Sequence, residues 1–216
     1  SEKEFIYKYR EAAEQAEVDA AISDIVDESI ASLNSGPPVR IILDSLPYTN
    51  ETKEKITKEF KYILKLLNFS ETGADLYRRW YVDGLLYFHI VIDRNKPIEG
   101  IKELNLIDPT HLKRVKEIKE HIDKKTGVKI SQVENEYFVY SNTESSNSSV
   151  KTAVSIAKEA IIEVNSGLTD PRRQRRVSHL HKALKVVNQL RTMEDALVIY
   201  RLARAPERRI FYIDTG

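Results

Sequence analysis

VSHLHKALKVVNQLRTMEDALVIYRLARAP, residues 177–206, has the strongest apolar periodicity of the 216-residue chain. Its apolar side chains recur every three or four positions, as Val177, Leu180, Leu184, Val187, Leu190, Met193, Leu197 and Tyr200. This spacing predicts one α-helix of about 28 residues, roughly 40 Å long at 1.5 Å per residue. Pro206 ends the helix, because the residue before a proline disfavours helical backbone angles. A helix of this length spans the whole domain or leads to a partner.

Three shorter helices are predicted upstream. The first covers 17–34, where apolar residues keep the helical spacing until two consecutive prolines end it. The second begins at Thr49 or Asn50, whose side chain can accept hydrogen bonds from the free amides, and ends near Asn68. Its core face consists of Ile56, Phe60, Ile63, Leu64 and Leu67. The third, GADLYRRWYVDG, covers 73–84 and ends at a glycine turn.

Strand patterns occupy most of the middle of the chain. VRIILD, 39–44, predicts a short buried strand, and 85–108 predicts a β-hairpin or meander from its aromatic and β-branched runs. VENEYFVYS, 133–141, alternates as a strand does, and AIIEVNSGL, 160–168, predicts a strand that enters a glycine turn. Two signals conflict over 109–122, where apolar residues recur at helical spacing in a lysine-rich segment, so helix and strand stay equal alternatives there. The polar segment SNTESSNSS, 141–149, is expected to be a mobile surface loop.

These elements predict an α+β fold, in which several helices, one of them long, pack on a small mixed or antiparallel sheet. The formal net charge is only +1, so no global field favours a nucleic acid or a membrane. Charge is instead segregated: residues 1–60 hold thirteen acidic and seven basic side chains, and residues 171–216 hold four acidic and eleven basic ones. The absence of cysteine excludes disulfides, a thiolate nucleophile and cysteine-ligated zinc.

The sequence offers no convincing catalytic, metal or cofactor pattern. The glycines fall where turns are needed and form no phosphate-binding motif, and adjacent carboxylates on helices point apart. His179 and His181 are two positions apart, which places them on different sides of a helix and does not suit paired metal ligation. The remaining enzymatic hypothesis uses Asp83 or Asp108 beside His89. We expect no enzyme and no cofactor.

Two arginine clusters are the candidate interaction sites. The run PRRQRR supplies candidate phosphate contacts, although without interleaved aromatic residues we favour a solvated loop; its arginines are Arg172, Arg173, Arg175 and Arg176. The second cluster surrounds the end of the long helix, where arginines favour the helix dipole and can pair with carboxylates of a neighbouring subunit or face DNA; its members are Arg201, Arg204, Arg208 and Arg209. A sequence-independent nucleic-acid-binding protein that uses 171–209 is therefore the alternative function, and steep loss of affinity with salt would mark it.

The segment HLHKALKVVNQLRTMEDALVIYRLARAPERRIFYIDTG resembles the central signature of the portal vertex proteins of contractile-tailed bacteriophages. Four upstream segments resemble that family in the same order and spacing: EVDAAISDIVDESI, RRWYVDGLLYFHIVID, GIKELNLIDPTHLKRVKEI and AIIEVNSGL. The resemblance covers nearly all of 1–216 and is weakest over 123–160.

The resemblance implies a structural subunit of a dodecameric ring at one capsid vertex, which is the conduit for genome packaging and ejection. It implies as partners the terminase motor, the major capsid and scaffold proteins, the neck or head-completion proteins, and the double-stranded DNA that passes through the channel. It places the protein in the virion, and in the host cytoplasm during assembly. Residues 1–216 would form the wing-like N-terminal region of a longer portal chain, with the stem, clip and crown not included. We also expect the acidic N-terminal third and the basic C-terminal fifth to meet on neighbouring subunits.

Overall fold

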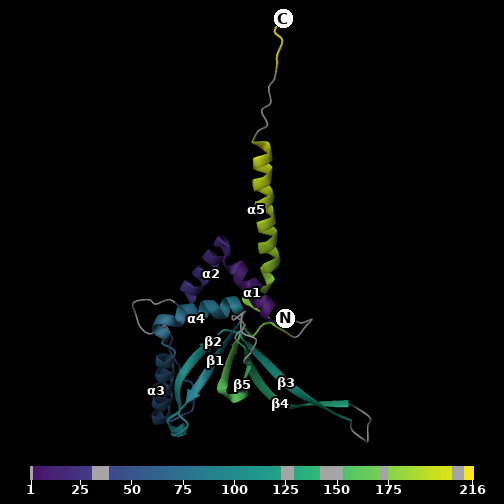
Figure 1. The fold of residues 1–216 in the computed structure, drawn as a ribbon. Coiled ribbons are helices and arrows are strands. Elements are labelled where there is room, and N and C mark those ends of the chain that lie inside the picture. The colour runs from purple at the N-terminus through teal and green to yellow at the C-terminus, as the bar shows by residue number, and fades with distance from the viewer. Residues whose placement is uncertain (1, 31–38, 123–128, 142–152, 171–174, 206–211) are drawn as a thin grey trace.

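The computed structural model describes residues 2–30, 39–122, 129–141, 153–170, 175–205 and 212–216. In these residues the helices gather on one side of the strands, and the last helix projects away from both (Figure 1). The α-helices are α1 Glu2–Ala13, α2 Ala16–Ser29, α3 Asn50–Leu66, α4 Phe69–Asp83 and α5 Leu184–Arg204. Short 3₁₀ turns are η1 Pro97–Glu99, η2 Lys158–Ala160 and η3 His179–Lys182.

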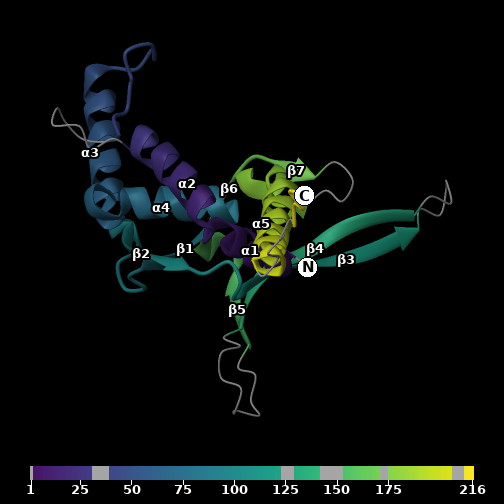
Figure 2. The same ribbon diagram turned by 90° about the horizontal axis from the view of Figure 1, so that it is seen from above.

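The described strands form two three-stranded antiparallel sheets and one short ribbon. The strands are β1 Leu85–Ile92, β2 Ile101–Ile107, β3 Leu112–Ile122, β4 Lys129–Ser141, β5 Ala153–Ala157, β6 Ile161–Asn165, β7 Thr169–Asp170 and β8 Arg175–Arg176. The first sheet has the order β2-β1-β6, the second has the order β3-β4-β5, and β7 pairs with β8. The β3–β4 hairpin extends from the body as an arm, as Figure 2 shows.

Two apolar clusters hold the body together. The helical cluster joins α1, α2, α4 and η3 through Tyr9, Ala13, Ile22, Val26, Val82 and Leu180. The second cluster joins the two three-stranded sheets through Leu85, Tyr87, Leu112, Phe138 and Ile161. Because α4 runs directly into β1, Val82 of the helical cluster is only three residues from Leu85 of the second cluster, and the helices and sheets share one continuous body.

Gly84 makes the direct junction between α4 and β1 possible. Its φ angle is +73°, in the left-handed region, where a residue with a Cβ atom is strained. A Cβ atom there would lie 2.7 Å from the Cα atom of Ser178. The buried Ser178 hydroxyl donates to the carbonyl oxygen of Tyr81 at 3.0 Å and accepts from the amide of Leu180 at 3.0 Å. The close approach therefore fixes η3, which precedes α5, against the end of α4.

The α+β class and most predicted elements are confirmed. Thr49 caps α3 by accepting a hydrogen bond from the amide of Thr52, and the predicted hairpin over 85–108 is formed by β1 and β2. The strands predicted over 133–141 and 160–168 correspond to β4 and β6. The ambiguous segment 109–122 is resolved as strand β3, because β4 pairs with it along its full length.

Three predictions about local structure are wrong. Residues 39–44 form no strand, and Ile42 is 71% exposed, because none of the described strands pairs with this segment. The apolar row of α3 is not a core face, since none of its side chains is buried. The last helix has 21 residues and begins at Leu184 because η3 occupies the preceding turn.

One observed helix was not predicted, and two predicted segments extend beyond the described residues. Helix α1 was not predicted, although Ile6, Tyr9 and Ala13 recur at helical spacing and are buried. The helix expected over 17–34 is observed as α2, and its expected end among 31–38 lies outside the described residues, as does most of the 141–149 loop.

Candidate functional site

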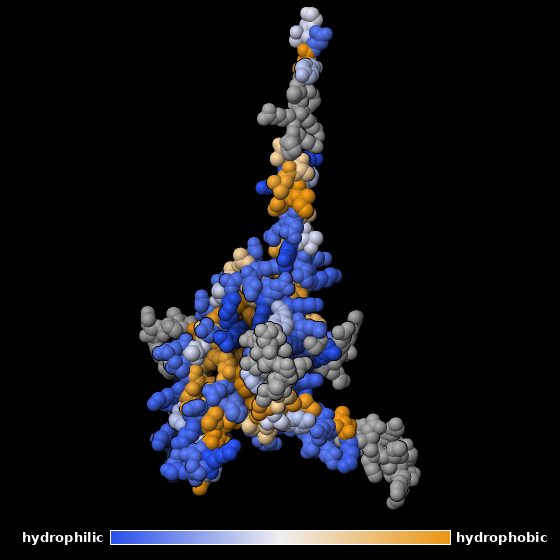
Figure 3. Space-filling model, in the orientation of Figure 1, coloured by the Kyte–Doolittle hydropathy of each residue, from blue (hydrophilic) through white to orange (hydrophobic). Residues whose placement is uncertain are grey.

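Helix α5 leaves the body instead of spanning it. Figure 1 shows it as a column that extends beyond every other described helix and strand. Val187, near its first turn, is its one buried residue. Eight apolar side chains farther along or around the helix are 39–70% exposed: Val186, Leu190, Met193, Leu197, Val198, Ile199, Tyr200 and Leu202. The space-filling view in Figure 3 shows this apolar surface over the outer part of the column.

We call these eight side chains the α5 apolar surface. The apolar row predicted from the sequence is buried at Leu180 and Val187, but the structure exposes its outer members, which are Leu190, Met193, Leu197 and Tyr200. Burying one Leu, Ile, Val or Met side chain fully stabilises a fold or a complex by about 1.5–3 kcal/mol. Large contiguous apolar patches on soluble proteins mark interaction sites. The α5 apolar surface is therefore the candidate site for contact with another protein surface.

The base of α5 is attached firmly to the body. The Tyr9 hydroxyl and Nδ1 of His181 share a hydrogen bond of 2.8 Å, and Leu180 belongs to the helical cluster. Farther out, Arg191 binds Glu11 of α1 at 3.0 Å through exposed side chains. Fixed at its base, the helix carries the α5 apolar surface away from the core in a defined direction.

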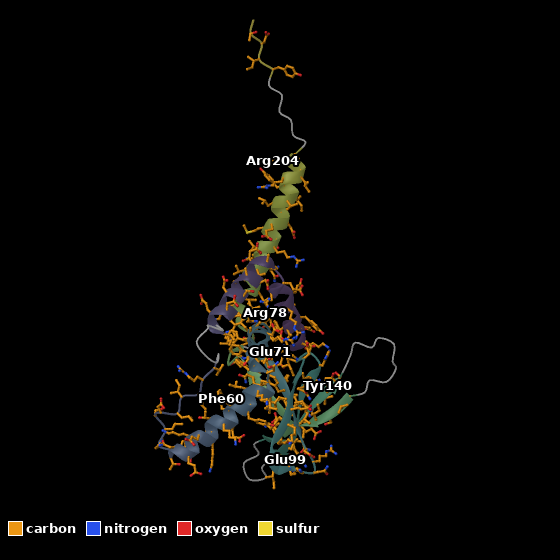
Figure 4. The ribbon with its side chains drawn as sticks, turned by 90° about the vertical axis from the view of Figure 1, so that its left-hand side faces the viewer. Phe60, Glu71, Arg78, Glu99, Tyr140 and Arg204 are labelled. Carbon is orange, nitrogen blue, oxygen red and sulfur yellow. The ribbon has the colours of Figure 1, made fainter. Side chains whose placement is uncertain are left out.

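The predicted arginines lie in two separate places. Arg201 and Arg204 are exposed on the last turn of α5, where their charge favours the helix dipole. The guanidinium of Arg204 lies over the Tyr200 ring, 4.4 Å from its centroid, and Figure 4 shows it far from the labelled residues of the body. Arg208 and Arg209 lie outside the described residues.

The other predicted cluster belongs to the body. Arg175 and Arg176 form β8, and the Arg176 guanidinium binds Glu163 of β6 at 2.7 Å. Arg172 and Arg173 lie outside the described residues. At Arg176, the charge that could contact phosphate is therefore already engaged by a carboxylate of the same fold.

An ion-pair cluster that was not predicted connects α1, α4 and the segment after β2. Arg10 donates to both carboxylate oxygens of Asp83, at 2.9 and 2.7 Å, and to Asp108 at 2.9 Å. Hydrogen bonding to Asp83 raises the pKa of Arg10 above its ordinary value. Burial would raise the pKa of Asp108, but hydrogen bonds from Arg10 and Thr110 outweigh it and hold this pKa at about 2. We call Arg10, Asp83 and Asp108 the Arg10 clasp.

A second charged cluster joins the two larger sheets. Arg114 of β3 lies between Glu136 of β4 and Glu163 of β6, while Lys158 binds Glu136 at 2.6 Å. The hydrogen bond from Lys158, with those from Arg114, lowers the pKa of Glu136 to about 2. Burial raises the pKa of nearby Tyr87 to about 12. This cluster orients the sheets relative to each other.

The residues of the enzymatic hypothesis do not form one hydrogen-bonded group. His89 and Asp108 line a cavity of about 280 Å³, whereas Asp83 is held on the far side of Arg10. A general acid or base works best with a pKa near the working pH, and the pKa of Asp108 lies far below neutrality. Among the described residues, no group of three or more His, Cys, Asp or Glu side chains is arranged to hold a metal ion. No helix in this part of the chain is long and apolar enough to cross a membrane.

Comparison with known proteins identifies the family. Residues 2–216 match the family described as Bacteriophage T4-like portal protein (Gp20). The chain is 40% identical over 227 residues to the portal protein of Vibrio phage KVP40, an alignment that covers 99% of this chain and 43% of that relative. It is 30% identical over 229 residues to the portal protein of Salmonella phage ViI, covering 100% of this chain and 41% of that relative. The chain thus spans less than half the length of these curated relatives. It belongs to the family of T4-like bacteriophage portal proteins.

Proposed function

We propose that this protein is a structural subunit of a dodecameric portal ring at one vertex of a phage capsid. The ring is the conduit through which double-stranded DNA enters during packaging and leaves during ejection. Family membership supports this role, and the observation that carries the proposal is the α5 apolar surface, which projects from the body without cover in the described residues. The role is structural and requires no catalytic group or cofactor.

The α5 apolar surface packs against neighbouring subunits in the proposed ring. Ring interfaces are heterologous, so two unlike surfaces meet at each contact. The basic end of α5 has a candidate counterpart in the exposed acidic side chains of α2 other than Asp19, which pairs with Arg78; they are Glu17, Asp24, Asp27 and Glu28. Arg201 and Arg204, with Arg208 and Arg209 beyond them in the sequence, accordingly face either the carboxylates of a neighbour or the DNA channel.

Residues 1–216 form the wing-like region in this proposal, and a stem, clip and crown belong to a longer portal chain. The proposed partners are the terminase motor, the major capsid and scaffold proteins, and the neck or head-completion proteins. The protein acts in the virion after assembly in the host cytoplasm. A formal net charge of +1 suits a conduit, because strong phosphate binding would stall moving DNA. The comparisons give no support to the alternative of a general nucleic-acid-binding protein.

Mass photometry of the protein expressed from its complete gene tests the proposal. We expect a closed oligomer of about a dozen subunits, as ring interfaces repeat until the rotation closes. Leu197→Asp places a carboxylate within the α5 apolar surface and is expected to weaken each subunit contact by about tenfold or more. Ile98→Asp is the matched control, because Ile98 is 100% exposed in η1 on the body. A monomer at all concentrations, or equal assembly of both variants, would contradict the proposal.

A further inference from the structure

A second cavity of the body has a cationic lining that the proposed ring contact does not use. It has a volume of about 480 Å³ and lies where α1, β1, β3 and β8 meet. Its cations come from three distant parts of the sequence: Lys3 from α1, Lys113 and Arg114 from β3, and Arg175 from β8. Among its described lining residues, Glu2 supplies the one carboxylate. We call this cavity the cationic pocket.

One cation of the pocket, Arg114, is engaged inside the fold, which leaves Lys3, Lys113 and Arg175 as the candidate ligand contacts. Arg114 and Arg176, which follow Lys113 and Arg175 in the sequence, both bind Glu163, at 3.4 and 2.7 Å. Arg114 lines the pocket but is held by Glu136 and Glu163, whereas Arg176 lies outside the lining. Among the described residues, no ion pair to a carboxylate is found for Lys3, Lys113 or Arg175, and the Lys3 ammonium lies 5.8 Å from the centroid of the Tyr7 ring. Their charges are available to a ligand.

The floor of the cationic pocket is apolar. Ile6, Leu85 and Leu112 are buried side chains that line it, together with the buried Pro109. A simple anion gains nothing from such a floor, whereas an apolar side chain that covers it removes apolar surface from water. Ligand pockets of a few hundred Å³ commonly combine an apolar lining with a few polar groups that fix orientation. The lining therefore suits a ligand with carboxylates next to apolar side chains.

We propose that the cationic pocket binds an acidic peptide segment of a partner protein, with its carboxylates on Lys3, Lys113 and Arg175 and an apolar side chain on the floor. Charge-assisted hydrogen bonds from lysine and arginine to carboxylates supply the specificity. Nucleic acid fits the pocket less well. Single strands bind through exposed aromatic faces, but Tyr87 of the lining is only 3% exposed, and a phosphate gains nothing from the apolar floor.

Selection from a phage-displayed library of random heptapeptides on the immobilised protein tests this assignment. The protein is expressed from its complete gene. The pocket variant carries Lys113→Glu and Arg175→Gln. The matched control carries Lys61→Glu and Lys65→Gln, which make the same changes of charge on two exposed lysines of α3. Thermal unfolding of each variant establishes that it is folded before selection.

The wild type and the α3 control are expected to enrich peptides that combine acidic and apolar residues. The enrichment on the pocket variant is expected to be about tenfold lower, because the variant lacks one or two charge-assisted contacts to the peptide. Selected peptides with no acidic bias, or equal enrichment on the pocket variant, would overturn the proposal. Displacement of the bound phage by an oligothymidine but not by a selected peptide would assign the pocket to nucleic acid instead. The test does not depend on ring assembly, so it can fail while the portal role stands.

Discussion

Removal of Arg10 should destabilise the body more than removal of any comparable exposed arginine. Asp83 is the last residue of α4, where the helix dipole disfavours a negative charge, and its side chain is only 5% exposed. Arg10 contacts both of its carboxylate oxygens and also reaches Asp108. Arg10→Met keeps much of the aliphatic packing but leaves the Asp83 carboxylate buried without its cation.

The magnitude follows from burial. Removing one partner of a fully buried ion pair costs about 3–5 kcal/mol. The Arg10 side chain is 35% exposed, so water can partly replace it, and we expect a loss of about 2–3 kcal/mol in the free energy of unfolding. For a chain of this size that corresponds to a fall in Tm of about 4–12 °C. Urea unfolding followed by circular dichroism measures the loss.

Two further variants separate the clasp from a general effect of charge. Arg78→Met breaks the exposed pair between Arg78 and Asp19 and should cost no more than about 1 kcal/mol. Adding Asp83→Asn to Arg10→Met removes the unpaired carboxylate and should restore part of the lost stability. The reasoning is refuted if Arg10→Met and Arg78→Met cost the same, or if Asp83→Asn brings no recovery in the Arg10→Met background.

Three other predictions concern pH, backbone and assembly. The pKa of Asp108 in the folded protein is about 2, below its ordinary 3.8, so the stabilisation from ionised Asp108 is complete above about pH 4 and is lost as the pH falls toward 2. After allowance for solvent screening, the lost stabilisation amounts to roughly 1 kcal/mol. The urea midpoints of wild type and Asp108→Asn should therefore converge as the pH falls over that range. Gly84→Ala should cost about 2 kcal/mol or more in urea unfolding, because its Cβ would meet the backbone of Ser178 and its φ is positive; an unchanged midpoint would contradict the junction described above. Charge reversal at Arg208 and Arg209 should weaken assembly and reduce its dependence on salt in sedimentation experiments, and unchanged assembly would argue against the acidic-to-basic contact.

Local patterns in the sequence predict secondary structure well where the stabilising contacts are also local. Helix α3 has its cap at Thr49, and the β1–β2 hairpin has a turn between two β-branched runs, so both are evident from neighbouring residues. Segment 39–44 has a strand-like composition, but a strand requires a partner from elsewhere in the chain. Strand β3 illustrates the reverse case, since pairing with β4 decides a segment whose own spacing is ambiguous.

The candidate sites depend on contacts that sequence spacing does not contain. Arg10 is 73 residues from Asp83 and 98 from Asp108, so no local pattern predicts the clasp. Periodicity predicts α5 as a helix but cannot distinguish an apolar row that packs against the same chain from one that packs against another protein. The same limit applies to Arg175 and Arg176, which look alike in the sequence but face the cationic pocket and Glu163 respectively.

A cryo-electron microscopy reconstruction of the protein expressed from its complete gene tests the central claim most directly. The account predicts closed rings in which the outer part of α5 lies against a neighbouring subunit, so that Leu197 and Tyr200 are covered at every interface. Rings in which α5 stays exposed to solvent would contradict the role of the α5 apolar surface. The absence of closed rings under all assembly conditions would contradict the proposed portal subunit itself.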